Sequence, residues 1–599
     1  MIRSFVRWFA HARRHEGALL LGVFVVALPL ASLVYALALR NPPGGYECQF
    51  VLRHLDILLP TLHDGRWAAL LTAPDTALGS ASLAQSLAAE LGLWLAPHRF
   101  GAFYLGTIFL TILTTGAVAL ATRFACLARW PAGPGGWAAL WAVLLLLYAP
   151  LALMNAINFN NSAAIVAHCA ASLAAYMWAR HTRRRVAWLV ASLVLVLGLY
   201  VQVVWALAFM LGMLLVACLD EAIAHGWRAG LSAVGIVAGG LVLAGVWRID
   251  WWRGADNVAL PTVLAMLGAS ALLYVWAQWL RRRTAPMQAL LAYMAPALLI
   301  MLLWLECNGN AAGVRAAMTG MVQARPALLT GYVPALLGYC LRSNPLLGLV
   351  LAASSLAGGL LLARRSPGLL LVLPFAVLML RYGLVAAPAA LQVLLVVLCV
   401  LAGIGAVWLW QAGARGITAM AGAQWHARLN TTTAYGCVTA GLLLIGLPSL
   451  VHAPQRDFEM GTGLPFPVLD AATPLQHALQ QMADCVPDAA VVTFTAPQPA
   501  LSHLTIDAFA RLQQRHWQLR DWPNLNAGTA PADIDYFVLA GPAQSASPYF
   551  IQPIVREHCA QQKALLDAMP GLTNLVDVVC GKDALRLCIY ARRPAPPLQ

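Results

Sequence analysis

The sequence predicts an all-helical polytopic membrane domain followed by a small C-terminal α/β domain. Hydrophobic residues make up 61% of the 599 residues, charged residues only 10%, and the mean hydropathy is +0.72. A soluble chain has about 25% charged residues. Up to residue 451 the chain contains many apolar stretches of roughly 18 or more residues, each long enough to cross a bilayer as a helix. Beyond residue 451 the polarity becomes ordinary, and strand and helix patterns alternate.

About thirteen spans are predicted in the membrane domain, which covers residues 1–451. The first is too long for the core of a signal peptide and lacks a small-residue cleavage site, so we expect it to remain as a helix. The spans lie near residues 17–38, 102–122, 135–154, 162–180, 186–202, 204–219, 229–247, 259–279, 287–305, 344–363, 367–383, 386–410 and 433–451.

The arginines of the short connections predict the orientation. By the positive-inside rule these loops hold the cytoplasmic side, which places the N-terminus in the cytoplasm of a bacterial inner membrane and residues 452–599 in the periplasm. The segment 186–219 is either one long helix or a hairpin that turns near Tyr200 and Gln202. A single helix would put Arg281–Arg283 outside, so the hairpin is favoured. Because the arginines serve this purpose, the net charge of +14 does not indicate a nucleic-acid partner.

The C-terminal domain, residues 452–599, shows buried-strand and helix patterns in alternation. Strands are predicted at 489–495, 534–540 and 585–590, and helices at 473–483, 501–514 and 553–569. Four cysteines, Cys485, Cys559, Cys580 and Cys588, lie in this domain. In the periplasm one or two disulfides are expected among them, and buried thiols are the alternative.

The first outer loop, residues 39–101, is the strongest indication of chemistry. Five of the eleven carboxylates that precede Val451 lie in it, and a carboxylate at a membrane surface costs desolvation energy unless it is paired or functional. Two amphipathic helices are expected, at 48–59, ended by Pro60, and at 80–95, both lying in the interface plane. A fixed carboxylate there can act as a general base or hold a divalent cation. Alternatively the acids only pair with nearby arginines. The candidates are Glu47 and Asp56 as catalytic groups and Arg53, His54 and Asp64 as binding groups.

Three further outer segments carry candidate binding residues. The asparagines near 155–161 either bind sugar hydroxyls or cap helices. The charges near 248–256 either bind a lipid phosphate or sugar or pair with each other. Arginines in the loop 306–343 suit phosphate, because their planar forks bind it in a bidentate manner. The candidates are Asn158, Asn160, Arg248, Asp250, Arg315, Arg325, Tyr332 and Arg342. By contrast, His168 within a span is expected to be a satisfied core histidine.

Several function classes have no support in the sequence. There is no P-loop, no GxGxxG after a strand, no HExxH, no CxxC pair and no GxSxG elbow. No internal repeat of the kind that builds many transporters is visible, and the predicted spans hold almost no ionisable side chains.

The layout resembles the GT-C superfamily of membrane glycosyltransferases, which includes oligosaccharyltransferases, protein O-mannosyltransferases and the aminoarabinose transferases that modify lipid A. The features it shares with them are the long first outer loop with two interfacial helices, an acidic residue just after the first span, many spans and a C-terminal periplasmic domain. Glu47, after Tyr46, stands where the family often has Asp, and Asp56 is the alternative. The WWD-type signature of oligosaccharyltransferases is absent.

The resemblance implies transfer of a sugar from a polyprenyl-phosphate donor to a glycan, glycolipid, lipid A-type or protein acceptor at the outer face. An arginine of the loop 306–343 would steady the leaving phosphate. No cofactor is certain, and a divalent metal ion remains possible. The competing interpretations are an O-antigen polymerase or ligase, which usually lacks such a C-terminal domain, a transporter or flippase, and a scaffold without enzymatic activity.

Overall fold

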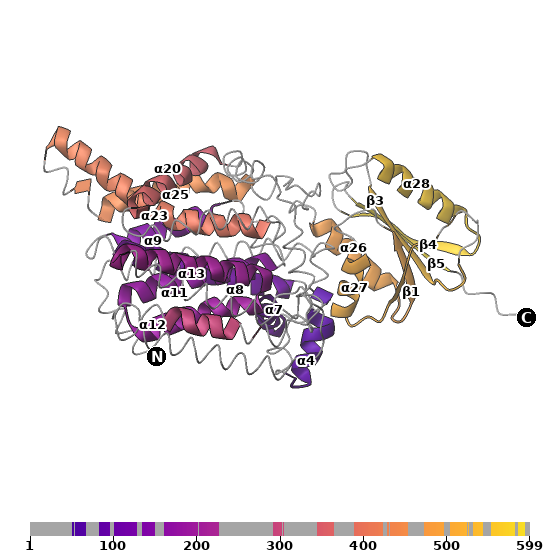
Figure 1. The fold of residues 1–599 in the computed structure, drawn as a ribbon. Coiled ribbons are helices and arrows are strands. Elements are labelled where there is room, and N and C mark those ends of the chain that lie inside the picture. The colour runs from indigo at the N-terminus through magenta and orange to yellow at the C-terminus, as the bar shows by residue number, and fades with distance from the viewer. Residues whose placement is uncertain are drawn as a thin grey trace, which may run out of the picture.

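The computed structural model of the protein comprises a helical domain and a C-terminal α/β domain (Figure 1). The structure describes residues 51–52, 54–66, 83–95, 101–127, 134–149, 152, 161–201, 203–226, 292–301, 304, 344–363, 388–422, 428–429, 432–452, 472–495, 503–523, 525, 531–542, 553–580 and 585–592.

Each described helix of the bundle overlaps a predicted span, although α23 (Pro388–Ala421) extends well beyond the span predicted at 386–410 and α9 (Gly135–Leu147) ends before the end of the span predicted at 135–154. Three segments are long and apolar enough to cross a membrane by length and composition: Leu105–Leu127, Pro345–Ala363 and Gln392–Met420. The number thirteen stays a prediction, because spans such as 17–38 and 259–279 lie outside the described residues. The helices are α8 (Gly101–Leu127), α9 (Gly135–Leu147), α11 (Asn161–Thr182), α12 (Arg185–Val196), α13 (Val203–His225), Ala292–Met301, α20 (Pro345–Ala363), α23 (Pro388–Ala421) and α25 (Thr432–His452).

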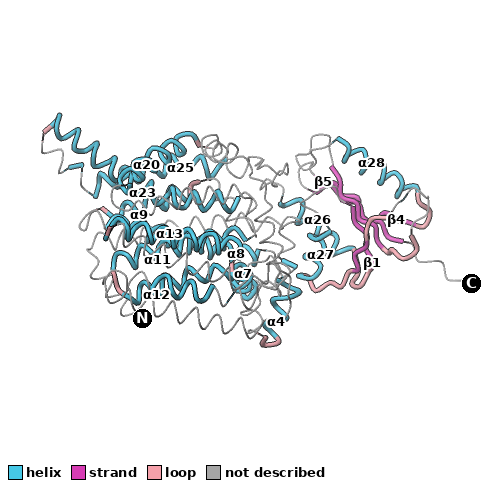
Figure 2. Tube along the Cα trace, viewed as in Figure 1, coloured by secondary structure: helices cyan, strands magenta, loops and turns pink. Residues whose placement is uncertain are grey.

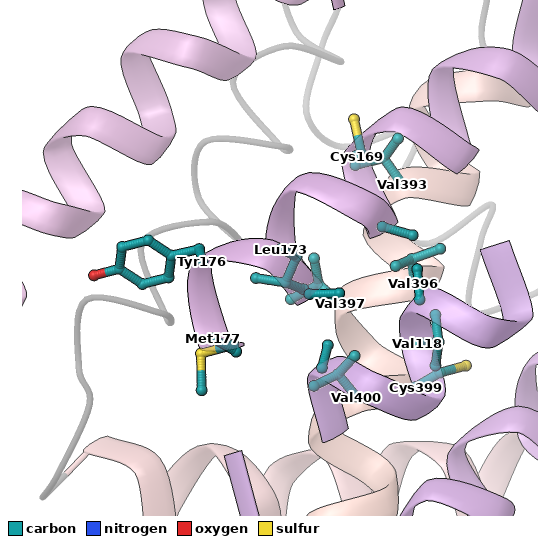
Figure 3. Packing of buried hydrophobic residues seen from close by; sticks show 14 of the residues in the cluster. Val118, Cys169, Leu173, Tyr176, Met177, Val393, Val396, Val397, Cys399 and Val400 are labelled. Carbon is teal, nitrogen blue, oxygen red and sulfur yellow. The ribbon is translucent and has the colours of Figure 1, made fainter. Parts of the chain in front are cut away.

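Close packing of small and branched side chains holds this bundle together. Leu173 of α11 lies among valines of α23, and Val118 of α8 lies in the same cluster (Figure 3). Helices α20 and α23 approach even more closely, because a Cβ atom at Gly405 would collide with the carbonyl oxygen of Ser354. Lipid tails supply no hydrophobic drive between helices, so such close backbone approach is what stabilises a membrane bundle.

The segment 186–219 forms the predicted hairpin. Helix α12 continues into a 3₁₀ turn, Leu197–Tyr200, and α13 begins at Val203. Near the end of α13, Asp220 accepts hydrogen bonds from Tyr176 (2.8 Å) and Arg180 of α11. Tyr176 also contacts Trp188 at the start of α12, with ring centroids 5.6 Å apart. Since the end of α13 returns to the level where α12 starts, the two helices are antiparallel.

The prediction that His168 is a core histidine is confirmed for its burial, although its Nδ1 atom has no hydrogen-bond partner. His168 of α11 is 7% exposed. Its Nε2 atom lies 3.0 Å from the carbonyl oxygen of Leu195 and 3.1 Å from that of Val194, both on α12. This side chain therefore joins two helices of the bundle.

The C-terminal domain is a three-layer α/β/α unit built on one mixed sheet, magenta in Figure 2. The strand order is β2-β1-β3-β5-β4, in which β1 is parallel to β2 and β3, and β5 is antiparallel to β3 and β4. The strands are β1 (Val491–Thr495), β2 (Gln518–Arg520), β3 (Tyr536–Pro542), β4 (Leu572–Cys580) and β5 (Leu585–Arg592), and the helices are α26 (Ala472–Cys485), α27 (His503–Leu512) and α28 (Pro553–Ala568).

The two faces of the sheet bury alternate residues of the same strands, as the two-residue period of a strand requires. Val538 and Ala540 of β3 pack with α26 and α27. Phe537 and Leu539 pack with α28 on the opposite face. The three predicted strands and three predicted helices are thereby confirmed, while β2 and β4 were not predicted.

The expected disulfides do not form. Cys485, Cys559, Cys580 and Cys588 are all free thiols. Cys559 and Cys588 fill the core beneath α28, and Cys580 fills the core on the other face. They serve as small apolar side chains, a role in which buried cysteine is common.

The first outer loop and the C-terminal domain lie at the same end of the helical bundle (Figure 1). Phe103 at the start of α8 and Tyr200 at the end of the 3₁₀ turn pack with residues of the first loop. Arg180 lies at the opposite end of α11, where it binds Asp220, and Arg123 lies beside Gly135 at the start of α9. Arg123 and Arg180 therefore lie away from the first outer loop, while the orientation of the bundle in a membrane stays a prediction.

Candidate functional site

The first outer loop folds as two short helical segments over the start of α8. Residues Val51 and Leu52 are helical, and they are followed by the π-helical turn η1 (His54–Leu58) and by α4 (Leu59–His63). The second segment is α7 (Leu83–Leu95), so a helix within the predicted range 80–95 is confirmed, while its position in the interface plane stays a prediction. The prediction that the first loop helix ends at Pro60 is wrong. Pro60 lies in the first turn of α4, where an N–H group makes no hydrogen bond within the helix, so a proline is tolerated there.

The π turn η1 points its side chains at different elements of the protein. Single π turns are rare, and they occur frequently at functional sites. Within η1, His54 is fully buried, whereas the Asp56 side chain is 42% exposed. The turn thus presents two of the predicted site residues to two separate environments.

Helix α7 packs against α8 through a close backbone contact. A Cβ atom at Gly106 of α8 would lie only 2.5 Å from the backbone carbonyl of Ala88. Beside this contact, Gln85 donates a buried hydrogen bond to the hydroxyl of Thr107 (3.1 Å). The second loop helix is therefore held tightly on the first described span.

His54 and Glu90 connect the two segments of the loop. The Nε2 atom of His54 lies 3.1 Å from Oε2 of Glu90, and the carboxylate accepts the hydrogen bond. This bond, opposed by partial burial, lowers the pKa of the Glu90 carboxyl below its ordinary value. His54 also contacts the edge of Phe103, with ring centroids 5.5 Å apart. Glu90 is therefore an ionised, oriented carboxylate at neutral pH, with its side chain 34% exposed.

Asp56 binds an arginine of the C-terminal domain. Arg511 of α27 donates a hydrogen bond to Oδ1 of Asp56 and another, of 3.0 Å, to Oδ1 of Asp507. Partial burial raises the pKa of Asp56. The attraction of Arg511 lowers it and the repulsion of Asp507 raises it, and the net direction is upward. Among carboxylates of the loop, Asp56 thus holds its proton more tightly than an exposed Asp does.

Asp64 pairs with a nearby arginine, which is the alternative to a functional role that the sequence leaves open for the acids of the loop. It accepts a hydrogen bond of 2.7 Å from Arg66, and both side chains are more than half exposed. A pair of this kind contributes little to stability.

The structure brings His54 and Asp56 into one turn and adds Glu90 to them. Glu90 is one of the acids of the loop, but the apolar and small residues around it on α7 give no reason to select it. Its contact with His54 spans 36 residues and has no local sequence signal. The other candidates lie outside the described residues: Glu47, Arg53, Asn158, Asn160, Arg248, Asp250, Arg315, Arg325, Tyr332 and Arg342.

The described carboxylates of the loop are engaged with basic side chains. In the part of the chain that the structure describes, no three His, Cys, Asp or Glu side chains gather in a way that could hold a metal ion. The chemistry that this arrangement offers is that of oriented carboxylates, one with a raised and one with a lowered pKa.

Comparison with known proteins yields similar structures but no similar sequences. No protein-family model and no curated protein matches the chain. Two crystal structures of ArnT from Cupriavidus metallidurans, one in the apo state and one bound to undecaprenyl phosphate, superpose on it with a TM-score of 0.45. Their sequence identity to the chain is 12% and 13%, and the alignments cover 95% of this chain and 98% of each ArnT chain.

Proposed function

We propose that this protein is a membrane glycosyltransferase that moves a sugar from a polyprenyl-phosphate donor to an acceptor hydroxyl at the periplasmic face. The acceptor is a glycan, a glycolipid such as lipid A, or a protein. A carboxylate of the first outer loop, Glu47 or Asp56, acts as the general base. The enzyme lies in the bacterial inner membrane with the C-terminal domain in the periplasm.

One observation carries this proposal. The first outer loop is packed onto the start of α8, at the end of the bundle opposite Arg123 and Arg180, and it holds the partly exposed carboxylates of Asp56 and Glu90 there. A carboxylate fixed at the membrane surface faces both a lipid-borne donor and an acceptor from the periplasm. This is the place where transfer from a lipid-linked sugar has to occur.

The proposed reaction needs a general base for the acceptor hydroxyl and a cation for the leaving phosphate. The base removes the proton of the acceptor hydroxyl as the oxygen attacks the anomeric carbon, and the bond to the polyprenyl phosphate breaks on the opposite side of the sugar. The anomeric centre is thereby inverted. The leaving phosphate gains charge, which a guanidinium fork from Arg315, Arg325 or Arg342 would neutralise. Asn158 and Asn160 are proposed to bind sugar hydroxyls, and Arg248 and Asp250 to bind the lipid phosphate or sugar.

Transport is less well supported by the described helices. Asp220 is a buried carboxylate near a helix end, and it is bonded to Tyr176 and Arg180. A transporter needs ionisable groups along a pathway through the membrane. The described carboxylates that lie near an exposed surface belong instead to the loop and to the C-terminal domain.

The test is turnover by the purified protein in nanodiscs. A panel of labelled polyprenyl-phosphate sugars is incubated with the protein and with outer-membrane glycolipid or periplasmic extract, and the release of polyprenyl phosphate is measured. We expect release that depends on the acceptor. The variant that removes the base, Glu47→Gln or Asp56→Asn, should lower kcat by about 10²- to 10⁴-fold.

The matched control is Asp484→Asn, which neutralises an exposed carboxylate of α26 that hydrogen-bonds Gln480 within its own helix. It should retain activity. Turnover that is equal in the wild type and in both loop variants would contradict the assignment of the base, and an absence of turnover with every donor would contradict the proposed function.

A further inference from the structure

Helix α27 of the C-terminal domain has two packing faces. Ile506, Phe509 and Ala510 pack against the sheet of their own domain. Ala508 and Leu512, one turn apart, pack instead with Val51 and Leu52 and other apolar residues of the first outer loop. A single helix therefore belongs to the cores of both parts of the protein.

A charged cluster borders this second face. Arg511 lies between Asp56 of η1 and Asp507, its own i−4 neighbour on α27. Two carboxylates share one guanidinium, so Arg511 also neutralises a repulsion between the loop and the domain. Without it, Asp56 and Asp507 would face each other across the contact.

The π turn η1 is consequently held from two sides. Toward the membrane domain, His54 binds Glu90 of α7 and contacts Phe103 of α8. Toward the C-terminal domain, Asp56 binds Arg511. The two contacts start only two residues apart, so a displacement of α27 moves the same turn that carries the predicted site residues.

We propose that the C-terminal domain positions the first outer loop through α27, with Arg511 as a positioning residue that acts through Asp56. Part of this proposal, that the loop is catalytic, rests on the proposed function. The mechanical part does not: α27 and η1 form one coupled unit whatever reaction the protein performs. The C-terminal domain is then a component of the site's scaffold and not an independent module.

The test compares two arginines of the C-terminal domain. Arg511 and Arg586 are equally exposed, at 45% and 44%, and each binds Asp residues. Arg586 binds Asp577 on the neighbouring strand, within its own domain. Arg511→Met and Arg586→Met therefore remove similar ion pairs, of which only the first reaches the loop.

The measurement is amide hydrogen exchange of the full-length protein in nanodiscs. Arg511→Met should speed exchange in the peptide that covers residues 54–63 by about threefold to fivefold. This factor corresponds to the free energy that an exposed ion pair contributes to stability. Arg511→Glu should speed it by roughly tenfold or more, because it brings like charges together. In both variants exchange in β1 and β3 should stay unchanged, which shows that the C-terminal domain remains folded.

Arg586→Met should leave exchange in residues 54–63 as in the wild type. Unchanged exchange of that peptide in both Arg511 variants, or an equal acceleration in Arg586→Met, would overturn the proposed coupling. The reversed pair, Asp56→Arg with Arg511→Asp, should restore slow exchange relative to Arg511→Glu, and failure to do so would also contradict it.

A kinetic measurement separates the positioning role from the proposed function. If the enzyme turns over, Arg511→Met should lower kcat severalfold with little change in the donor KM, while Arg586→Met should change neither. If exchange becomes faster in Arg511→Met but kcat does not change, Arg511 does not position the loop for catalysis. If the wild type shows no turnover with any donor, the proposed function fails, and hydrogen exchange alone still decides whether α27 and the loop are coupled.

Discussion

Two carboxylates of the first outer loop have pKa values shifted in opposite directions, and the cause in each case is the immediate environment. Burial raises the pKa of Asp56 despite the attraction of Arg511. The hydrogen bond from His54 lowers the pKa of Glu90 despite its partial burial. A general base needs a proton affinity suited to the working pH, and an upward shift brings a carboxylate closer to it. This favours Asp56 over Glu90 among the described acids.

The pH dependence of turnover tests which carboxylate is the base. If Asp56 is the base, kcat/KM falls as the pH drops through its raised pKa. Arg511→Met removes the attraction that lowers this pKa, so the acid limb of the profile should move to higher pH. If the acid limb of the pH profile stays in place in both Arg511→Met and Arg586→Met, Asp56 is not the base and the role is assigned to Glu47.

The hydrogen bond between His54 and Glu90 should contribute to stability in a pH-dependent way. Because the folded-state pKa of Glu90 is lowered from 4.5, its contribution is present above that value and is lost as the pH falls through the folded-state pKa. Glu90→Gln should therefore cost about 1 kcal/mol near pH 7, a charge-assisted bond reduced by solvent exposure, and much less at low pH.

Thermal unfolding in detergent at several pH values measures this difference. Glu557→Gln, at an exposed position of α28, is the control and should unfold like the wild type throughout. A cost of Glu90→Gln that does not shrink on acidification would show that the carboxylate charge is not what His54 binds.

At the scale of elements, local sequence patterns predict most of the helices and strands, and long-range contacts decide the rest. Strand β4 was missed because it is an edge strand whose side chains are largely exposed, and β2 because it has only three residues. The prediction of a helix end at Pro60 is wrong because a helix can begin around a proline as readily as it can end before one. Disulfides were expected from compartment alone, but the thiols pack into the two cores of the domain.

The contact between α7 and α8 should depend on the absence of a side chain at Gly106. Gly106→Ala would place a methyl group against the backbone of Ala88, so we expect a loss of about 1–3 kcal/mol, the cost of overpacking. On the same helix, Gly116 has no atom within 4 Å of its would-be Cβ. Gly116→Ala should be neutral or slightly stabilising, because alanine favours helix.

Thermal unfolding of the two variants gives the comparison, and hydrogen exchange of residues 83–95 locates the damage. Equal stability of Gly106→Ala and Gly116→Ala would mean that α7 is not seated on α8 as described.

At the scale of the whole molecule, the two ends of the bundle differ in character. One end carries the first loop and the C-terminal domain, and Arg123 and Arg180 lie toward the other. The sequence predicts this polarity from arginine positions alone. It does not predict the joining of α27 to the loop, because the contact between Asp56 and Arg511 spans 455 residues and no local pattern encodes it.

The orientation can be tested with reporter fusions. Alkaline phosphatase fused after residue 599 should be active in cells, because the C-terminal domain is expected in the periplasm, and a green fluorescent protein fused there through the same export route should be dark. The same reporters placed after residue 183, between α11 and α12, should give the reverse. A fluorescent C-terminal fusion would place the loop and its carboxylates in the cytoplasm.

The most direct test of the central claim is a cryo-EM structure of the full-length protein in nanodiscs with added undecaprenyl phosphate. We expect the phosphate to lie at the loop end of the bundle, within hydrogen-bond distance of Arg315, Arg325 or Arg342 and across a cavity from Glu47 or Asp56. A phosphate bound at the end near Arg180, or a continuous passage through the bundle with the lipid inside it, would contradict the proposed transferase and favour transport.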